Sequence, residues 1–425
     1  MNQQNVFRAF VCIILNLCCI LTVFVSTSYA QNTVIKAGHL FDSRTGKMLK
    51  DQIIIIKNRK ITAVGPDLKY SAADSVIDLS GSYVLPGLMD CHVHITANLP
   101  YRKVSFPDSY NKESTGFRAL EGAFVATQLL EGGFTTIKDI GNDANYATAD
   151  VIKAMRKGWV KGPTIFYSGK IIAPYGGQSS GINPEHEHQW DFEYIDADTP
   201  DEIKKAVRKN IYFGANTIKM VSGDNAVYNT EDIKAAVDEA KKSGIKVTVH
   251  VMGGEGARNV INGGAAAIEH GFGLDDDLLR LMKEKGTFLV GTDFSFDNWY
   301  AYGMDSATAK RLAENIADRL KRAYTIGTKM AFGTDIIIDL PGFNRLQTNL
   351  KVLQSWKTAA IPAAYILQTM TIYSAELLGI EKSRGIIEPA YWADIIAVKQ
   401  NPLEDIDAVK QVHFVMKEGK LIKKN

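Results

Sequence analysis

Short apolar runs that read as β-strands alternate with helical segments through most of this chain, and this alternation constrains the fold more than any other feature. Helical spacing, with apolar residues three and four positions apart, occurs in 117–130, 201–211, 231–242 and 274–284. Strand-like runs cover 83–94, 134–137, 164–167, 217–221, 246–251, 266–268, 287–290 and 330–332. Such alternation over about 300 residues favours a (β/α)₈ TIM barrel. The alternative is an open doubly wound sheet, but the first unit has no Gly-rich dinucleotide loop.

Both ends of the chain carry further short strand-like runs. They cover 52–56, 60–64 and 75–79 near the N-terminus, and 394–398, 412–416 and 420–422 near the C-terminus. We therefore expect an α/β chain in which a small β-sandwich domain is formed from both ends, residues 31–82 and 385–425. The barrel domain would then occupy residues 83–384. Apolar residues make up 46% of the chain, enough for a sizeable core, and the net charge of +2 is too balanced to indicate a nucleic-acid partner.

The first 30 residues have the pattern of a signal peptide. Arg8 supplies a positive charge, residues 11–25 are almost wholly apolar, and Ser28-Tyr29-Ala30 places small residues where a signal peptidase cleaves, before Gln31. The apolar run falls short of the ~20 residues that span a bilayer. We expect an exported protein, periplasmic or secreted, with no stable membrane span after cleavage. An uncleaved membrane anchor is the alternative, and lipidation is disfavoured because Cys18 and Cys19 lie inside the run.

Four histidines lie in or after strand-like runs. His92 and His94 are two residues apart, so on an extended strand both side chains point to the same face and can bind one metal ion. His250 and His270 each close an apolar run. One such histidine is usually a buried packing residue, but two more at strand ends are hard to explain by packing. The carboxyl ends of parallel barrel strands converge on one mouth, where barrel enzymes keep their chemistry.

Lys219 lies in the run 217–221, and Asp335 follows Gly333-Thr334 after the run 330–332. A protonated lysine cannot bind a metal. A neutral amine can react with carbon dioxide to form a carbamate, whose two oxygens can bridge two ions about 3.5–4 Å apart. A structural or substrate-binding lysine is the alternative. Asp335 can bind a metal through one oxygen and accept a proton through the other. Tyr228, after the lysine run, is a candidate substrate contact, with packing as an equal alternative.

These residues and several local motifs resemble the amidohydrolase superfamily of metal-dependent barrel hydrolases. The resemblance covers most of the chain and rests on Pro-Gly-Leu-Met-Asp-Cys-His-Val-His at 86–94, Gly-Phe-Thr-Thr at 133–136, Ile-Glu-His-Gly at 268–271, Phe-Gly-Thr-Asp at 332–335, and the segments 392–396 and 401–403. Ile218-Lys219-Met220 resembles the fourth-strand segment of the dipeptidase branch, which is related to prolidase and imidazolonepropionase. Gln178 stands where relatives often have histidine, and it is therefore a candidate substrate contact.

The resemblance implies a binuclear site that uses two divalent metal ions, with Zn²⁺ favoured by the ligand types. His92, His94 and Asp335 would hold the first ion, His250 and His270 the second, and Lys219, carboxylated from carbon dioxide or bicarbonate, would bridge them. A shared hydroxide would attack a carbonyl carbon, and Asp335 would act as the catalytic acid and base.

The resemblance also implies the reaction and the partners. The expected reaction is hydrolysis of the amide or peptide bond of a dipeptide or small N-acyl amino acid. Opening of a cyclic amide, deamination, and hydrolysis of a lactone or phosphoester are alternatives on the same site, as is a scaffold protein without activity. The expected partner is a small molecule or dipeptide, and a homo-oligomer is compatible with the sequence.

Overall fold

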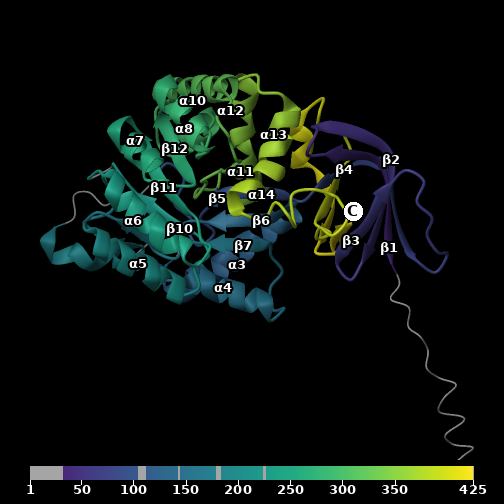
Figure 1. The fold of residues 1–425 in the computed structure, drawn as a ribbon, viewed down its shortest axis with the longest axis horizontal. Coiled ribbons are helices and arrows are strands. Elements are labelled where there is room, and N and C mark those ends of the chain that lie inside the picture. The colour runs from purple at the N-terminus through teal and green to yellow at the C-terminus, as the bar shows by residue number, and fades with distance from the viewer. Residues whose placement is uncertain (1–31, 104–111, 142–143, 179–182, 224–225, 425) are drawn as a thin grey trace, which may run out of the picture.

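The computed structural model describes residues 32–103, 112–141, 144–178, 183–223 and 226–424. Residues 1–31, on which the signal-peptide prediction falls, lie outside this range. Within the described residues, no helix combines the length and hydropathy that a membrane crossing requires. An α/β part and a strand-rich part lie at opposite ends of the molecule (Figure 1).

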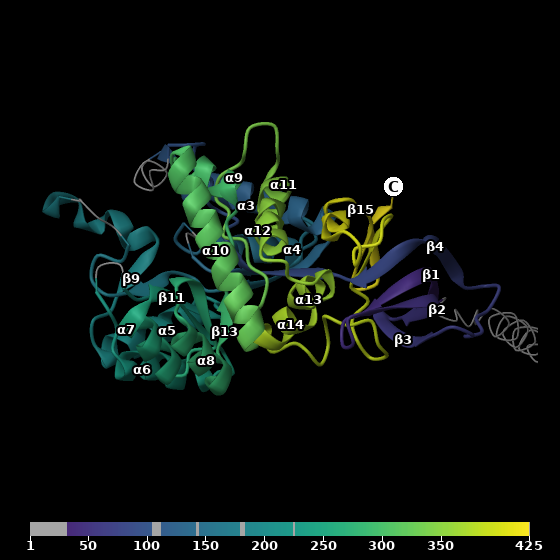
Figure 2. The same cartoon turned by 90° about the horizontal axis from the view of Figure 1, so that it is seen from above.

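Seven strands taken from both ends of the chain form one sheet in the order β16-β15-β14-β4-β1-β2-β3. In Figure 1 the purple N-terminal strands and the yellow C-terminal strands lie side by side, and Figure 2 agrees. The strands are β1 (Thr33–Asp42), β2 (Lys47–Lys57), β3 (Lys60–Gly65), β4 (Ser75–Pro86), β14 (Ile395–Val398), β15 (Val412–Lys417) and β16 (Lys420–Lys424). The expected shared sheet therefore exists. It is one continuous sheet, so a sandwich of two separate sheets is not confirmed.

The two faces of this sheet are buried in different cores. Because neighbouring side chains on a strand point to opposite faces, Ile396 and Val398 join the large core of the α/β part. Ile395 and Ala397 join a second core with residues of β1 and β2. The sheet thus shares the core of the α/β part.

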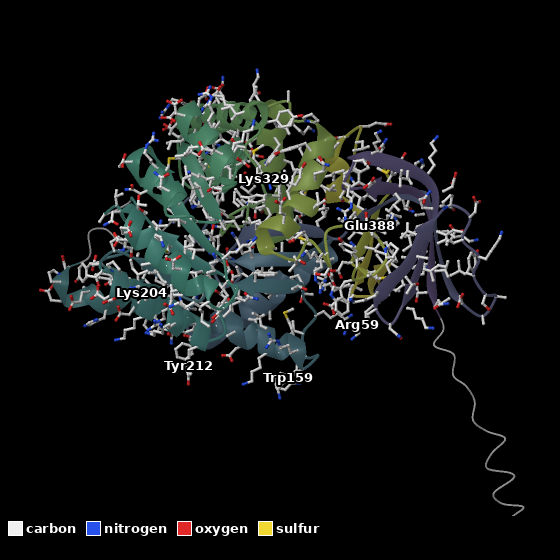
Figure 3. All side chains as sticks on the ribbon, in the orientation of Figure 1. Arg59, Trp159, Lys204, Tyr212, Lys329 and Glu388 are labelled. Carbon is white, nitrogen blue, oxygen red and sulfur yellow. The ribbon has the colours of Figure 1, made fainter. Side chains whose placement is uncertain are left out.

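Charged side chains link the two ends of the chain where the sheet meets the α/β part. Arg384, which is buried, pairs with Asp394 and with Glu418, the latter at 2.6 Å. Arg59 from the N-terminal strands, labelled in Figure 3, also pairs with Glu418. Lys417 donates to the hydroxyl of Thr164 in the α/β part at 2.8 Å. These contacts fix the sheet against the α/β part.

Two parallel sheets form the centre of the α/β part. The first has the order β5-β6-β7, with β5 (Leu88–Val93), β6 (Phe134–Asp139) and β7 (Thr164–Tyr167). The second has the order β13-β12-β11-β10-β8-β9, with β8 (Ile171–Ala173), β9 (Tyr194–Asp196), β10 (Ile218–Val221), β11 (Val247–Gly253), β12 (Ala267–Gly273) and β13 (Phe288–Val290). The parallel α/β architecture expected from the sequence is confirmed, while the barrel is not closed as one sheet.

The expected last strand, 330–332, does not join β13 to β5 in one sheet. It makes only a single bridge, between Met330 and Leu289. Its backbone still lies between the two sheets: Ala331 N donates to Leu289 O at 3.0 Å, and Cys91 N donates to Phe332 O at 2.7 Å. The three-residue strands β8 and β9 were not expected from the sequence.

Helices follow most strands and cover the parallel sheets. They are α3 (Thr115–Glu131), α4 (Ala147–Arg156), α5 (Pro200–Tyr212), α6 (Thr230–Lys241), α7 (Gly254–Asn262), α8 (Asp276–Lys285), α9 (Phe296–Ala301), α10 (Ser306–Ile326), α11 (Arg345–Asn349), α12 (Leu353–Thr358), α13 (Ala363–Thr369) and α14 (Ile372–Leu378), with short 3₁₀ turns at η1 (Pro184–Phe192), η2 (Leu350–Val352) and η3 (Ile406–Lys410). The helix expected at 231–242 covers Thr230–Lys241, with Asn229 as its N-cap.

Candidate metal centre

The six residues expected to bind metal line one cavity of about 110 Å³ at the carboxyl ends of the parallel strands. His92 and His94 come from β5 and the residue after it, Lys219 from β10, His250 from β11 and His270 from β12. Asp335 follows the segment that lies between the two sheets. The remaining lining consists of Ile171, Gln178, Tyr302 and Ile337.

The rings of His92 and His94 present nitrogen atoms to the same point. Their Nε2 atoms are 3.2 Å apart, and Asp335 Oδ1 lies 3.3 Å from the first and 3.0 Å from the second. On the other side of each ring, His92 Nδ1 donates to Glu269 Oε2 at 2.7 Å and His94 Nδ1 donates to Gly141 O at 2.8 Å. A carboxylate and a carbonyl only accept, so in the neutral rings both Nε2 atoms carry lone pairs.

His270 and His250 complete the group of rings. The centroid of His270 lies 5.0 Å from that of His92 and 4.3 Å from that of His250. One ligand atom from each of His92, His270 and Asp335 falls within 4.8 Å of the others, which makes these three residues a possible metal site. Two lone-pair nitrogens facing a carboxylate oxygen form a donor set that suits a divalent cation such as zinc.

The charges in the cavity agree with this donor set. Burial, together with the neighbouring His250, holds the pKa of His270 well below its ordinary value, so this ring stays neutral. Burial works against ionisation of Asp335, yet the adjacent His92 and His94 hold the pKa of this carboxyl well below its usual range. Burial disfavours a charge on His94, but the Asp335 carboxylate outweighs burial and raises the pKa of this ring. A metal needs neutral imidazoles and an ionised carboxylate from these residues, so metal binding would displace a proton held between His94 and Asp335.

Two of these residues have strained backbones. His270 has a φ of 68° and Asp335 a φ of 55°, in the left-handed region that non-glycine residues rarely occupy. Thr292, whose hydroxyl lies 2.8 Å from His270 Nδ1, has a φ of 45°. Strain of this kind costs on the order of 1–3 kcal/mol per residue and persists where surrounding structure holds it, often at functional sites.

A buried charge network beneath the cavity was missed by the sequence interpretation, which gave Glu269 no definite partner. Glu269 accepts from Lys138 Nζ at 2.7 Å, from the Thr248 hydroxyl and from His92. Burial raises the pKa of a carboxyl, but Lys138 and His92 outweigh it and hold the pKa of Glu269 well below its ordinary value. A lysine directly after the strand-like run 134–137 was the available signal, since a fully buried ammonium needs a partner.

The two candidate substrate contacts are placed differently. Gln178 lines the cavity, and its Oε1 accepts from the Tyr194 hydroxyl at 3.1 Å. Tyr228 is not in the lining. Its hydroxyl donates to Ala197 O at 2.7 Å and its backbone N donates to Ser222 Oγ at 3.0 Å, which matches the packing alternative. Tyr302 also lines the cavity, and its hydroxyl donates to Asp335 O at 3.0 Å.

A model of the Amidohydrolase family matches residues 83–422 of the chain. The chain belongs to this family. Ochratoxinase from Aspergillus niger is 29% identical to it, covering 94% of this chain and 88% of that relative. Imidazolonepropionase from Thermoanaerobacter pseudethanolicus is 23% identical and covers 82% of this chain and 84% of that protein.

Solved structures agree with the family. A Xaa-Pro dipeptidase with bound methionine in its active site is 30% identical, with a TM-score of 0.81, covering 92% of this chain and all of that one. The crystal structure of A. niger ochratoxinase has a TM-score of 0.80 at 25% identity and covers 93% of this chain and 96% of that one. The protein is therefore a hydrolase that acts on carbon–nitrogen bonds, in a family that is generally metal-dependent.

The network beneath the cavity leads to a test of stability. Glu269→Gln removes the charge that balances buried Lys138, and breaking such a pair costs about 3–5 kcal/mol. Urea denaturation of the metal-free protein should show this loss. The variant Lys138→Met/Glu269→Gln removes both charges and should recover much of it. Equal stability of the wild type and Glu269→Gln would show that the pair is energetically unimportant.

Proposed function

We propose that this protein is a two-metal hydrolase of the amide or peptide bond in small substrates such as dipeptides and N-acyl amino acids. The observation that carries the proposal is the convergence of six potential ligands on one cavity. The hydrogen bonds on both sides of the segment 329–332 support a (β/α)₈ arrangement around that cavity. Relatives described as a Xaa-Pro dipeptidase and as a prolidase complexed with N-methylphosphonate-L-proline support a peptide-like substrate.

We infer that His92, His94 and Asp335 hold one ion and that His250 and His270 hold the second. Lys219 is buried at the cavity wall. As a carbamate formed with carbon dioxide, it would be a ligand of both ions. Zinc suits these nitrogen and oxygen ligands. When bound, such ions supply Lewis acidity, which acidifies water and polarises a carbonyl oxygen.

Asp335 is the residue suited to move the proton. Its side chain is 18% exposed, compared with 1% for His92 and 6% for His94, so it is the more accessible of these groups. Oδ1 faces the two histidines, while Oδ2 lies 3.7 Å from His270 Nδ1. In hydrolysis, Asp335 would take a proton from the attacking water and give it to the leaving nitrogen as the C–N bond breaks.

The lining indicates a small substrate. A cavity of about 110 Å³ is below the roughly 300–1,000 Å³ of common ligand pockets. Ile171 and Ile337 offer apolar contact, and the Gln178 amide can hydrogen-bond a polar substrate group.

The carbamate predicts a joint loss of metal and activity. Lys219→Ala should reduce metal content from two ions per chain and lower kcat/KM by more than the roughly 10–100-fold typical of residues that only orient ligands. Metal analysis and kinetics of the same samples measure both, and reconstitution without bicarbonate should slow activation. Lys310→Ala, whose side chain is 73% exposed, is the matched control and should behave as wild type. Full activity of Lys219→Ala with two ions would rule out the bridge.

Substrate class is tested by a direct comparison of turnover. A dipeptide and N-acyl amino acid library should contain substrates. Lactones and phosphoesters should react at least about 100-fold more slowly, because discrimination follows how well the site binds each transition state. Turnover of a lactone or phosphoester, with none of any peptide or N-acyl amino acid, would reverse this assignment.

We also propose that the protein is exported, since residues 1–30 carry the signal-peptide pattern. Expression of the full chain in a bacterial host should give a product that begins at Gln31 in the periplasmic fraction. N-terminal sequencing and fractionation measure this. An intact Met1 in the membrane fraction would indicate an anchor instead.

A further inference from the structure

Arg319 is a fully buried cation that the proposed reaction does not use. It lies in the middle of α10, with its side chain 0% exposed, and pairs with Asp293, whose side chain is 1% exposed. Its guanidinium also donates to the carbonyl of His270 and to Gly291 O, 3.3 Å from Nη2. In Figure 2, α10 runs along the outside of the α/β part. The contacts of the buried Arg319 side chain join this helix to the segments that follow β12 and β13. Burying an ion pair costs desolvation free energy that apolar residues of similar size would not. This cost points to a role of Arg319 beyond packing.

The carbonyls that Arg319 binds belong to the strained segments of the cavity. His270 itself is left-handed, and Gly291 precedes the left-handed Thr292. The Thr292 hydroxyl contacts the His270 ring from the opposite segment, at 2.8 Å from Nδ1. Arg319 therefore holds the backbone of His270 through its carbonyl. Thr292 holds the His270 ring, and it directly follows Gly291, whose carbonyl Arg319 also binds.

Gly291 shows how closely these groups fit. A Cβ atom at this position would lie 2.3 Å from Asp293 Oδ1 and 2.6 Å from Arg319 Nη2. Both distances are far below van der Waals contact. The backbone of Gly291, directly after β13, therefore packs against the Arg319–Asp293 pair with no room for a side chain. The planar guanidinium matches this space because it offers several donors in one fixed fork, which an ammonium cannot do.

We propose that Arg319, together with Asp293, is a positioning residue that holds His270 in its left-handed conformation and thereby sets the metal affinity of the cavity. This inference rests on the proposed function, because it assumes that His270 is a metal ligand. Without the guanidinium, the His270 carbonyl loses its charged donor and the strained backbone can relax. The ring would keep its contact with Thr292 but would leave the position that it shares with His92 and Asp335.

The test measures zinc binding to the metal-free protein by competition with a chromophoric chelator. Arg319→Lys keeps the charge opposite Asp293 but loses the fork, and it should weaken zinc binding about 10–100-fold. Arg319→Met/Asp293→Asn removes both charges and should weaken binding similarly. Circular dichroism and thermal unfolding of the metal-free variants should show a folded protein in both cases.

Arg322→Lys is the matched control. Arg322 lies on the same helix and also donates to a backbone carbonyl, Leu274 O at 3.1 Å, but it does not contact the cavity segments. Its substitution should leave zinc affinity unchanged. Wild-type zinc affinity in both Arg319 variants would overturn the positioning role alone, as would loss of the fold in both. Absence of zinc binding by the wild-type protein would instead contradict the proposed metal centre, and with it the proposed function.

Discussion

The organisation of the cavity depends on one constraint: imidazoles must remain neutral and present lone pairs to a common point while buried. The structure meets this by giving the far nitrogen of each β5 ring an acceptor, Glu269 for His92 and the Gly141 carbonyl for His94. Each acceptor fixes both the tautomer and the orientation of its ring. The arrangement of ligands is therefore set one layer below the cavity.

That lower layer is itself charged and buried, which has an energetic cost. Glu269 is balanced by Lys138 from β6, and Asp293 by Arg319 from α10. Neither pair is expected to add much stability compared with apolar residues of similar size. Instead, the two pairs orient the metal-site residues: Glu269 orients the His92 ring, and Arg319 binds the carbonyl of left-handed His270. The fold accepts a local cost in exchange for a defined site geometry.

Much of this could be predicted from the sequence. The six candidate ligands were identified because each follows an apolar run, and parallel strands bring such positions together. The strand and helix order was also readable. The closed barrel was overestimated, because 330–332 looks like a strand but makes one bridge. Tyr228 followed the lysine run and was considered for substrate, yet its hydroxyl is directed at Ala197 O.

The residues that support the ligands could not be predicted in the same way. Lys138 and Glu269 are 131 positions apart, and Arg319 reaches His270 across 49. Such pairs have no local spacing, and the sequence alone does not reveal which buried charge finds which partner. The short strands β8 and β9 were not predicted either.

A crystal structure of the metal-loaded protein, with anomalous data collected at the zinc edge, tests the binuclear centre most directly. We expect two anomalous peaks about 3.5–4 Å apart, one beside His92, His94 and Asp335 and the other beside His250 and His270. Additional density beyond Lys219 Nζ should reach both peaks. A single peak, or an unmodified Lys219 directed away from the cavity, would contradict the binuclear centre on which the proposed chemistry rests.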